Sequence, residues 1–383
     1  MSEKKIKVMS VFGTRPEAIK MCPLVLELGK HPEIESVVCL TGQHREMLDQ
    51  VLELFAITPD VDLGIMKPSQ TLTDITRNVL GGLEEVFRKI QPDIVLVHGD
   101  TSTAFSSALS AFYHGLKVGH IEAGLRSFTR REPFPEEINR RLISQLADLH
   151  FAPTPVNKAN LILEGTSAES IYVTGNTVID SLLEMVEEGY NFQNPVLQSL
   201  DFSKRTLLAE IHRRENLEKL EEIYSGLLEI VERFADVQLI YSVHPNPRVK
   251  EAAVKVLGGK PRIHLIDPPA YKEWVNLMKR SYLILTDSGG LQEEAPSLGV
   301  PVLVIRDVTE RTEGVRAGTL RLIGSEKESV VRNAAELLTS GAAYESMRNS
   351  QNPYGDGNAS LRIKEALLHC FLQAKKPQDY IAL

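Results

Sequence analysis

Short apolar runs alternate with amphipathic segments along nearly the whole chain. In the first half, the runs predict strands at residues 6–12, 37–41, 94–97, 118–121 and 150–152. In the second half, they predict strands at residues 206–211, 238–243, 263–266, 283–286 and 300–305. Most runs lack polar alternation, which is typical of parallel strands that are buried on both faces.

Amphipathic helices are predicted between these strands, for example at residues 46–55, 80–90 and 220–234. Alternating strands and helices indicate right-handed βαβ units in a doubly wound sheet. The pattern occurs twice, and a polar stretch between Leu183 and Lys204 separates the two occurrences. We therefore predict an α/β protein with domains at residues 1–185 and 204–359, and a last helix near 360–373 that could pack on either domain.

Composition narrows the class of protein. The chain has 383 residues, of which 43% are apolar and 25% charged, as in ordinary globular proteins with two cores. We expect no membrane span and no secretory signal, and we expect the three scattered cysteines to be reduced thiols in the cytoplasm. The net charge of −8 argues against a nucleic-acid partner but leaves room for a small anionic ligand.

The turn Asp287-Ser288-Gly289-Gly290 follows the predicted strand 283–286. Ligands of open parallel sheets bind beyond the carboxyl ends of the strands. Glycines let the backbone approach an anion closely, and the helix that they open directs N–H groups and a positive dipole end at it. Glu294 lies about one turn later and could accept hydrogen bonds from a ribose. A tight turn with a helix N-cap is the alternative interpretation.

Three further segments follow strands in the second half. His212, Arg213 and Arg214 could neutralise a diphosphate, or they could be the charged start of a helix. The loop 306–314 is densely charged and could line the same site or be solvated. Segment 267–274 carries the only tryptophan, which could form one wall of a base pocket, although aromatic residues more often pack in a core.

The first strand leads into Gly13-Thr14-Arg15-Pro16, which is not the GxGxxG fingerprint of a nicotinamide or flavin enzyme. Arg15 and Lys20 flank the first turn of the helix that follows, and both could reach an anion. No zinc-type spacing, Walker loop or nucleophile elbow is present, so we expect neither a metal nor a cofactor.

Three acidic residues are expected at one edge of the first sheet: Asp100, Glu122 and Glu136. Each alone is more often a helix cap or an ion-pair partner than a catalyst. Gathered together, carboxylates should repel one another, and this repulsion should raise the pKa of at least one. The sequence therefore predicts an acid cluster in the first domain.

These motifs together resemble the non-hydrolysing UDP-N-acetylglucosamine 2-epimerase family. The resemblance spans nearly the whole chain, in order, at Phe12–Lys20, His98–Thr101, Glu122–Arg126, Pro135–Arg140, Gly175–Asp180, His212–Asn216, Asp287–Glu294 and Arg306–Gly318. It implies two Rossmann-like domains facing a cleft, the GT-B fold of glycosyltransferases and glycogen phosphorylase. It also implies that the C-terminal segment 360–383 packs back on the first domain.

The family interconverts UDP-GlcNAc and UDP-ManNAc without a metal or a cofactor. It eliminates UDP, forms a 2-acetamidoglucal, and adds UDP back with the C2 proton delivered to the other face. By resemblance, Asp100, Glu122 and Glu136 supply acid, base and charge stabilisation on the sugar side. We expect a homodimer that serves cell-envelope polysaccharide synthesis.

The resemblance also assigns the UDP contacts, which we state as expectations. His212 is placed among the catalytic residues at the leaving diphosphate, which Arg15, Lys20 and Arg311 would also stabilise. Ser288, Gly289 and Gly290 would donate backbone N–H groups to the diphosphate. Glu294 would bind the ribose, and Pro269 and Trp274 would flank the uracil.

One departure from the family pattern concerns the residues around His212. Glu210-Ile211 precede the histidine where the family has Thr-x-His, and no glycine follows soon after. A carboxylate at Glu210 could raise the pKa of His212 or could point into solvent.

Four other functions are alternatives to the non-hydrolysing epimerase. They are a hydrolysing epimerase, a sister UDP-sugar epimerase, a GT-B glycosyltransferase with an acceptor, and a non-catalytic UDP-sugar sensor.

Overall fold

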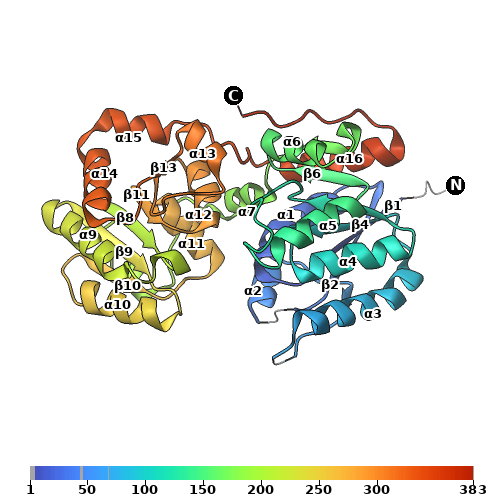
Figure 1. Ribbon diagram of the computed structural model, residues 1–383, viewed down its shortest axis with the longest axis horizontal. Coiled ribbons are helices and arrows are strands. Elements are labelled where there is room, and N and C mark those ends of the chain that lie inside the picture. The colour runs from blue at the N-terminus through green and yellow to red at the C-terminus, as the bar shows by residue number, and fades with distance from the viewer. Residues whose placement is uncertain (1–4, 44–45, 68, 383) are drawn as a thin grey trace. The chain divides into compact units, whose positions relative to one another are not determined.

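Both halves of the chain fold around a parallel sheet in the computed structural model, which describes residues 5–43, 46–67 and 69–382 (Figure 1). Unit 1 comprises Met1–Leu183 and Tyr354–Ala382, and unit 2 comprises Glu184–Pro353. Neighbouring strands are parallel throughout both sheets. The predicted fold class of two doubly wound parallel sheets is therefore confirmed. No helix in the described part of the chain has the length and apolarity that crossing a membrane requires.

Unit 1 contains a seven-stranded sheet in the order β3-β2-β1-β4-β5-β6-β7 within the described residues. Its strands are β1 (Ile6–Phe12), β2 (Ile34–Leu40), β3 (Val61–Asp62), β4 (Ile94–His98), β5 (Lys117–Ile121), β6 (Leu149–Ala152) and β7 (Ile171–Val173). The predicted strands lie within a few residues of these bounds. β3 and β7 were not predicted, because two or three residues are too few to show a periodic pattern.

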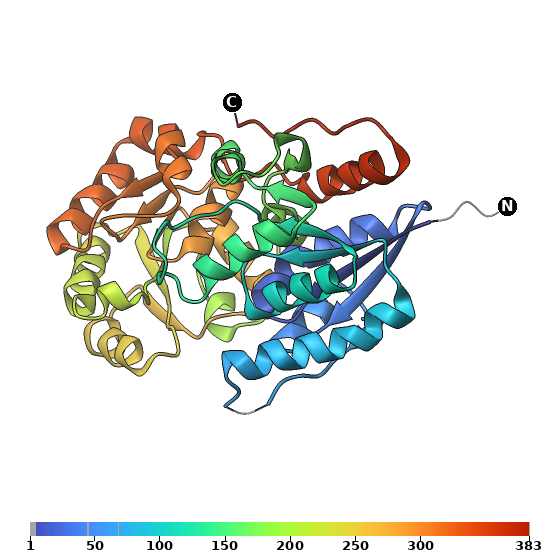
Figure 2. The same ribbon diagram turned by 45° about the vertical axis from the view of Figure 1, so that its right-hand side comes forward.

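Helices cover both faces of this sheet. They are α1 (Arg15–Gly29), α2 (Glu46–Leu54), α3 (Leu72–Ile90), α4 (Ser102–Tyr113), α5 (Glu136–Leu146), α6 (Pro155–Leu163), α7 (Thr177–Met185) and α16 (Ala359–Leu372). Helices α3, α4 and α5 pack side by side, and their apolar side chains form a core with β1, β2 and β4 (Figures 1 and 2). Right-handed crossovers place α1 and α2 on the opposite face, where α1 also contacts α16.

The C-terminal helix α16 is attached to unit 1 by polar contacts as well as by packing. The carboxylate of Asp180 accepts hydrogen bonds from the backbone N–H groups of Ala359 and Ser360, at 3.2 and 2.8 Å. The Nζ of Lys364 lies 3.0 Å from a carboxylate oxygen of Glu27 on α1. The first and last parts of the chain therefore form one folded unit.

Unit 2 contains a six-stranded sheet in the order β10-β9-β8-β11-β12-β13, the same winding as the first six strands of unit 1. Its strands are β8 (Arg205–Glu210), β9 (Val237–Ser242), β10 (Ile263–Ile266), β11 (Leu283–Thr286), β12 (Val302–Val304) and β13 (Leu320–Leu322). Its helices are α8 (Pro195–Gln198), α9 (Leu220–Arg233), α10 (Pro247–Leu257), α11 (Tyr271–Lys279), α12 (Gly289–Glu294), α13 (Thr312–Ala317), α14 (Lys327–Thr339) and α15 (Gly341–Arg348).

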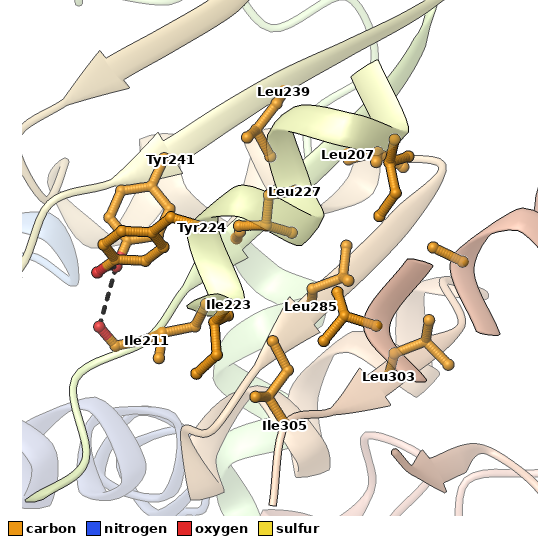
Figure 3. Close-up of a cluster of buried hydrophobic side chains, with 14 of the residues drawn as sticks. Leu207, Ile211, Ile223, Tyr224, Leu227, Leu239, Tyr241, Leu285, Leu303 and Ile305 are labelled. Carbon is orange, nitrogen blue, oxygen red and sulfur yellow. Dashed lines mark hydrogen bonds between the residues drawn. The ribbon is translucent and has the colours of Figure 1, made fainter. Parts of the chain in front are cut away.

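The core of unit 2 reaches the start of the loop that carries His212. Tyr224 on α9 and Tyr241 on β9 are fully buried, and their hydroxyl groups lie 2.6 Å apart. The Tyr241 hydroxyl donates a hydrogen bond to the carbonyl oxygen of Ile211 at 3.0 Å (Figure 3). This hydrogen bond holds Ile211, the residue between the end of β8 and His212.

The polar stretch between the two predicted domains groups with unit 2. A carboxylate oxygen of Glu273 accepts hydrogen bonds from the backbone N–H groups of Gln193 and Asn194, at 2.6 and 2.9 Å. The rings of Phe192 and Phe202 stack with their centroids 5.2 Å apart. The stretch thus has a structure that its polar composition does not reveal.

Candidate functional site

Glu122 lies directly after β5 and is the most constrained of the three acidic residues. Its Oε2 atom forms an ion pair with Nζ of Lys20 on α1 and accepts a hydrogen bond from Nδ2 of Asn176 at 2.9 Å. The Nε2 atom of His98 lies 3.7 Å from the same oxygen. Glu122 has a φ of 61°, a left-handed backbone that few non-glycine residues adopt and that is often found at functional sites.

Asp100 and Glu136 lie near the ends of β4 and α5. The Oδ2 atom of Asp100 forms an ion pair with Arg140 on α5, whose Nε lies 3.0 Å away. The side-chain amide of Asn139 donates to the backbone oxygen of Asp100 at 2.9 Å. Glu136 is the first residue of α5, is partly exposed, and has no ion-pair partner among the described residues.

Two of the three carboxylates each have a cation beside them, which offsets part of the repulsion expected between the acids. Lys20 compensates Glu122, and Arg140 compensates Asp100. Lys20, which was expected at the diphosphate, forms an ion pair with Glu122 in this structure.

Arg15 begins α1, and the loop before it is fixed by a buried acid. A carboxylate oxygen of Glu17 accepts hydrogen bonds from the N–H groups of Gly13 and Thr14, at 3.0 and 2.8 Å. The other oxygen accepts one from the hydroxyl of Thr101 at 2.5 Å. Burial raises the pKa of Glu17, and these hydrogen bonds oppose the rise. Arg15 itself is partly exposed and has no ion pair among the described residues.

His98, Asn176 and Arg140 were not among the predicted site residues. All three lie inside segments that carried the family resemblance, and His98 also directly follows the predicted strand 94–97. His98 is buried, and its Nε2 atom has no hydrogen-bond partner in the described part of the chain. Burial lowers the pKa of His98 to about 4, Glu122 opposes this shift, and Lys20 adds to it.

Replacing His98 by Gln should weaken the pH dependence of stability. Between pH 6.5 and about 4, the imidazole of His98 is protonated in the unfolded chain but neutral in the folded protein. The free energy of unfolding of the wild type therefore falls as the pH falls. At about 1.4 kcal/mol per pH unit, the drop from pH 7 to 4.5 should be about 2–3 kcal/mol smaller in the variant. Urea unfolding at both pH values measures it, with His31→Gln, a partly exposed histidine, as control. Equal slopes in wild type and His98→Gln would contradict this account.

Asp287 in unit 2 organises the loop that follows β8. It is completely buried, and its carboxylate accepts hydrogen bonds from the backbone N–H groups of His212 and Arg213, at 3.0 and 2.9 Å. It also accepts one from the side-chain amide of Asn216 at 2.9 Å. Asp287 is therefore an internal anchor, and it holds the loop without the glycine expected from the family pattern.

The turn after Asp287 opens α12, with one correction to the expectation. The N–H group of Ser288 donates to the hydroxyl of Thr286 at 2.9 Å, so the backbone donors available to a ligand begin at Gly289. A Cβ atom at Gly289 would lie 2.9 Å from Cζ of Arg311, which shows how closely this guanidinium covers the turn. Arg311 also pairs with Glu293 at 2.9 Å. Arg311 therefore lies against the turn at Gly289.

The charged loop 306–314 is not simply solvated. Arg306 is nearly buried, and its guanidinium bonds to Glu215 and Glu310, at 2.6 and 3.0 Å. Burial raises the pKa of Glu310, but the hydrogen bond from Arg306 outweighs this effect, and the pKa is lowered to about 2. Glu310 also lies 4.0 Å from Arg213 and 3.6 Å from Arg311. The carboxylate of Glu310 therefore lies close to three arginines at the end of the sheet.

His212 stacks on a second histidine. The rings of His212 and His244 are 4.8 Å apart at 17°, and Nδ1 of His244 accepts a hydrogen bond from the backbone of Asn246 at 3.1 Å. Burial lowers the pKa of His212, Asp287 opposes the shift, and His244 adds to it. The idea that Glu210 raises this pKa is wrong, because Asp287 is the carboxylate that acts on the histidine.

The remaining predicted contacts lie around α11 and α12. Pro269 precedes α11, Trp274 lies within it, and both are partly exposed. Glu294 ends α12 and is also partly exposed. Among the described residues, no group of three or more His, Cys, Asp or Glu side chains could hold a metal ion.

Comparison with known proteins gives a consistent result. A family model described as UDP-N-acetylglucosamine 2-epimerase matches residues 26–368. The UDP-N-acetylglucosamine 2-epimerase of Bacillus subtilis is 55% identical over 377 residues, which cover 98% of each chain.

Solved structures agree over the same length. A crystal structure from Listeria monocytogenes has a TM-score of 0.93 and 51% identity, covering 98% of this chain and 100% of that chain. The UDP-GlcNAc 2-epimerase of Neisseria meningitidis, solved bound to UDP-GlcNAc, has a TM-score of 0.85 and 48% identity, covering 94% and 99%.

Proposed function

This chain belongs to the UDP-N-acetylglucosamine 2-epimerase family, and we propose that it inverts C2 of UDP-GlcNAc without net hydrolysis. In the first step the C2–H bond and the C1–O bond to UDP break, which gives 2-acetamidoglucal and UDP. In the second step UDP adds back to C1, and a proton is delivered to C2 on the opposite face. The product is UDP-ManNAc, and the reaction is reversible.

The observation that carries this proposal is the compensated acid cluster of unit 1. A base at C2 must be ionised before reaction, and the cations Lys20 and Arg140 lie directly beside the carboxylates of Glu122 and Asp100. Glu136 has no such cation among the described residues and is partly exposed. Three acids with different surroundings provide a base, an acid, and a negative charge beside the positive charge that develops at C1.

Unit 2 supplies the groups for UDP in this proposal. Arg213, Arg311 and the N–H groups of Gly289 and Gly290 stabilise the departing diphosphate, because its charge increases as the C1–O bond breaks. His212, held by Asp287, contributes a hydrogen bond at the same place. Glu294 binds the ribose, and Pro269 and Trp274 flank the uracil. Arg15 of unit 1 adds a cation for the diphosphate.

Incubating the enzyme with UDP-GlcNAc in deuterated water tests the reaction. We expect UDP-ManNAc, deuterium at C2 of both sugars, and no accumulation of free ManNAc, because UDP is added back rather than lost. NMR follows the C2 position, and mass spectrometry follows free sugars. Free ManNAc with UDP as the end products would instead indicate a hydrolysing epimerase, and an unlabelled, unchanged substrate would refute epimerisation.

A further inference from the structure

Asn176 lies between Glu122 and Tyr354, the residue at which the chain re-enters unit 1. It follows β7 and is 4% exposed. Its side-chain Nδ2 donates to Oε2 of Glu122 at 2.9 Å, and its Oδ1 accepts from the N–H of Val178 in the first turn of α7 at 3.0 Å. Its backbone N–H donates to the carbonyl oxygen of Tyr354 at 2.7 Å. One residue thus bonds to the acid, the helix and the returning chain.

The returning chain and the Asn176 loop meet backbone to backbone. Gly175 has a φ of +85°, and a Cβ atom there would lie 3.3 Å from Cα of Gly355. A Cβ atom at Gly355 would lie 3.4 Å from the backbone nitrogen of Asn176. Little room remains for the loop to shift, so the position of the Asn176 amide is set by main-chain contacts rather than by a flexible side chain.

Glu122 needs such support from outside its own backbone. Its left-handed φ of 61° is unfavourable for a residue with a Cβ, so the surroundings must maintain it. Lys20 supplies charge but is a flexible side chain, whereas the Asn176 amide comes from a constrained loop. A hydrogen bond donated to a carboxylate also favours its ionised form.

We propose that Asn176 is a positioning residue for the reaction, which fixes the orientation and ionisation of Glu122 and is itself fixed by Tyr354. This inference rests on the proposed function of Glu122. Asn176 acts through Glu122 and makes no contact with substrate in this account. Its loss should therefore change kcat and the pH dependence of kcat, with little change in KM.

The variant Asn176→Asp separates this role from a structural one. Asp has the same shape and accepts the hydrogen bond from Val178 equally well, so the start of α7 should remain intact. However, it replaces the donor to Glu122 with a second carboxylate. The two groups should then share a proton and titrate as a pair, so that the fully ionised state appears only at higher pH.

In the epimerase assay, the acid limb of the kcat profile should move upward by about one to three pH units in Asn176→Asp. Activity at low pH should fall at least about tenfold, the value that one unit implies, and should recover at high pH with a nearly unchanged KM. Asn194→Asp is the matched control, because Asn194 also precedes a helix and accepts from the N–H two residues on, but it does not touch Glu122. That control should keep the wild-type profile.

Two outcomes separate failure of this inference from failure of the proposed function. If Glu122→Gln abolishes turnover but Asn176→Asp keeps the wild-type acid limb, Asn176 does not position Glu122. If Glu122→Gln remains active, the proposed role of Glu122 is wrong, and the inference is then decided by titration. Carboxyl ¹³C NMR of the Glu-labelled protein, with Glu122→Gln for assignment, should show a higher midpoint for Glu122 in Asn176→Asp. An unchanged midpoint would overturn the inference.

Discussion

Replacing Glu122 by Gln should lower kcat by about 10²–10⁴-fold, the contribution of a positioned acid or base, while UDP still binds. Gln keeps the size of the side chain and an oxygen that can accept from Asn176, but it can neither take a proton nor carry a charge opposite Lys20. The proposed UDP contacts are almost all in unit 2, so the Kd for UDP should change little. Loss of the acid should therefore affect the chemistry and not the binding of the nucleotide.

Steady-state kinetics with UDP-GlcNAc and calorimetry with UDP measure the two effects separately. Glu169→Gln is a suitable control, because Glu169 is exposed and lies outside the acid cluster. A variant that loses UDP affinity in parallel with kcat would make Glu122 a binding residue. Retained exchange of deuterium into C2 would show that another acid removes the proton.

Replacing Asp287 by Asn should cost both stability and UDP affinity. The buried carboxylate accepts from two backbone N–H groups and from the amide of Asn216. An Asn side chain presents an NH₂ group to some of these donors, and each unsatisfied buried group costs about 1–3 kcal/mol. We therefore expect a loss of about 2–5 kcal/mol in the free energy of unfolding. The loop that carries His212 and Arg213 should loosen, with at least about a tenfold weaker Kd for UDP.

Urea unfolding and UDP calorimetry on the same preparation test both parts. Asp201→Asn changes the same charge at an exposed position of unit 2 and should have little effect on either measurement. A folded Asp287→Asn protein with wild-type affinity for UDP would show that the loop does not depend on this anchor.

The strands that could be predicted were those with at least four mostly apolar residues between turn or loop segments. β1, β10 and β11 match their predicted bounds, whereas β3, β7 and β13 have only two or three residues and no pattern of their own. The acids were predicted because they follow strands. Their partners were not predictable in the same way, since Lys20 and Glu122 are separated by 102 positions and meet only through the order of the strands.

Local chemistry does not show every partner of a group that has two possible uses. Lys20 is a cation beside a helix start, which suits an anion site, and the fold also gives it an acid as a partner. The N–H of Ser288 belongs to a glycine-rich turn, yet the hydroxyl of Thr286, two residues earlier, accepts it. Asp287 looked like part of the ligand site, and its complete burial makes it a support for that site.

The attachment of α16 to α1 and α7 has a consequence for synthesis on the ribosome. Unit 2 is continuous in sequence and has all its described strands once residue 322 has emerged, whereas unit 1 lacks α16 until residues 359–372 have emerged. Until then, Asp180 lacks the N–H groups of Ala359 and Ser360, and Asn176 lacks Tyr354. The acid cluster therefore matures after the strands of unit 2, so a translation product that stops before residue 354 holds the acids without the contacts that arrange them.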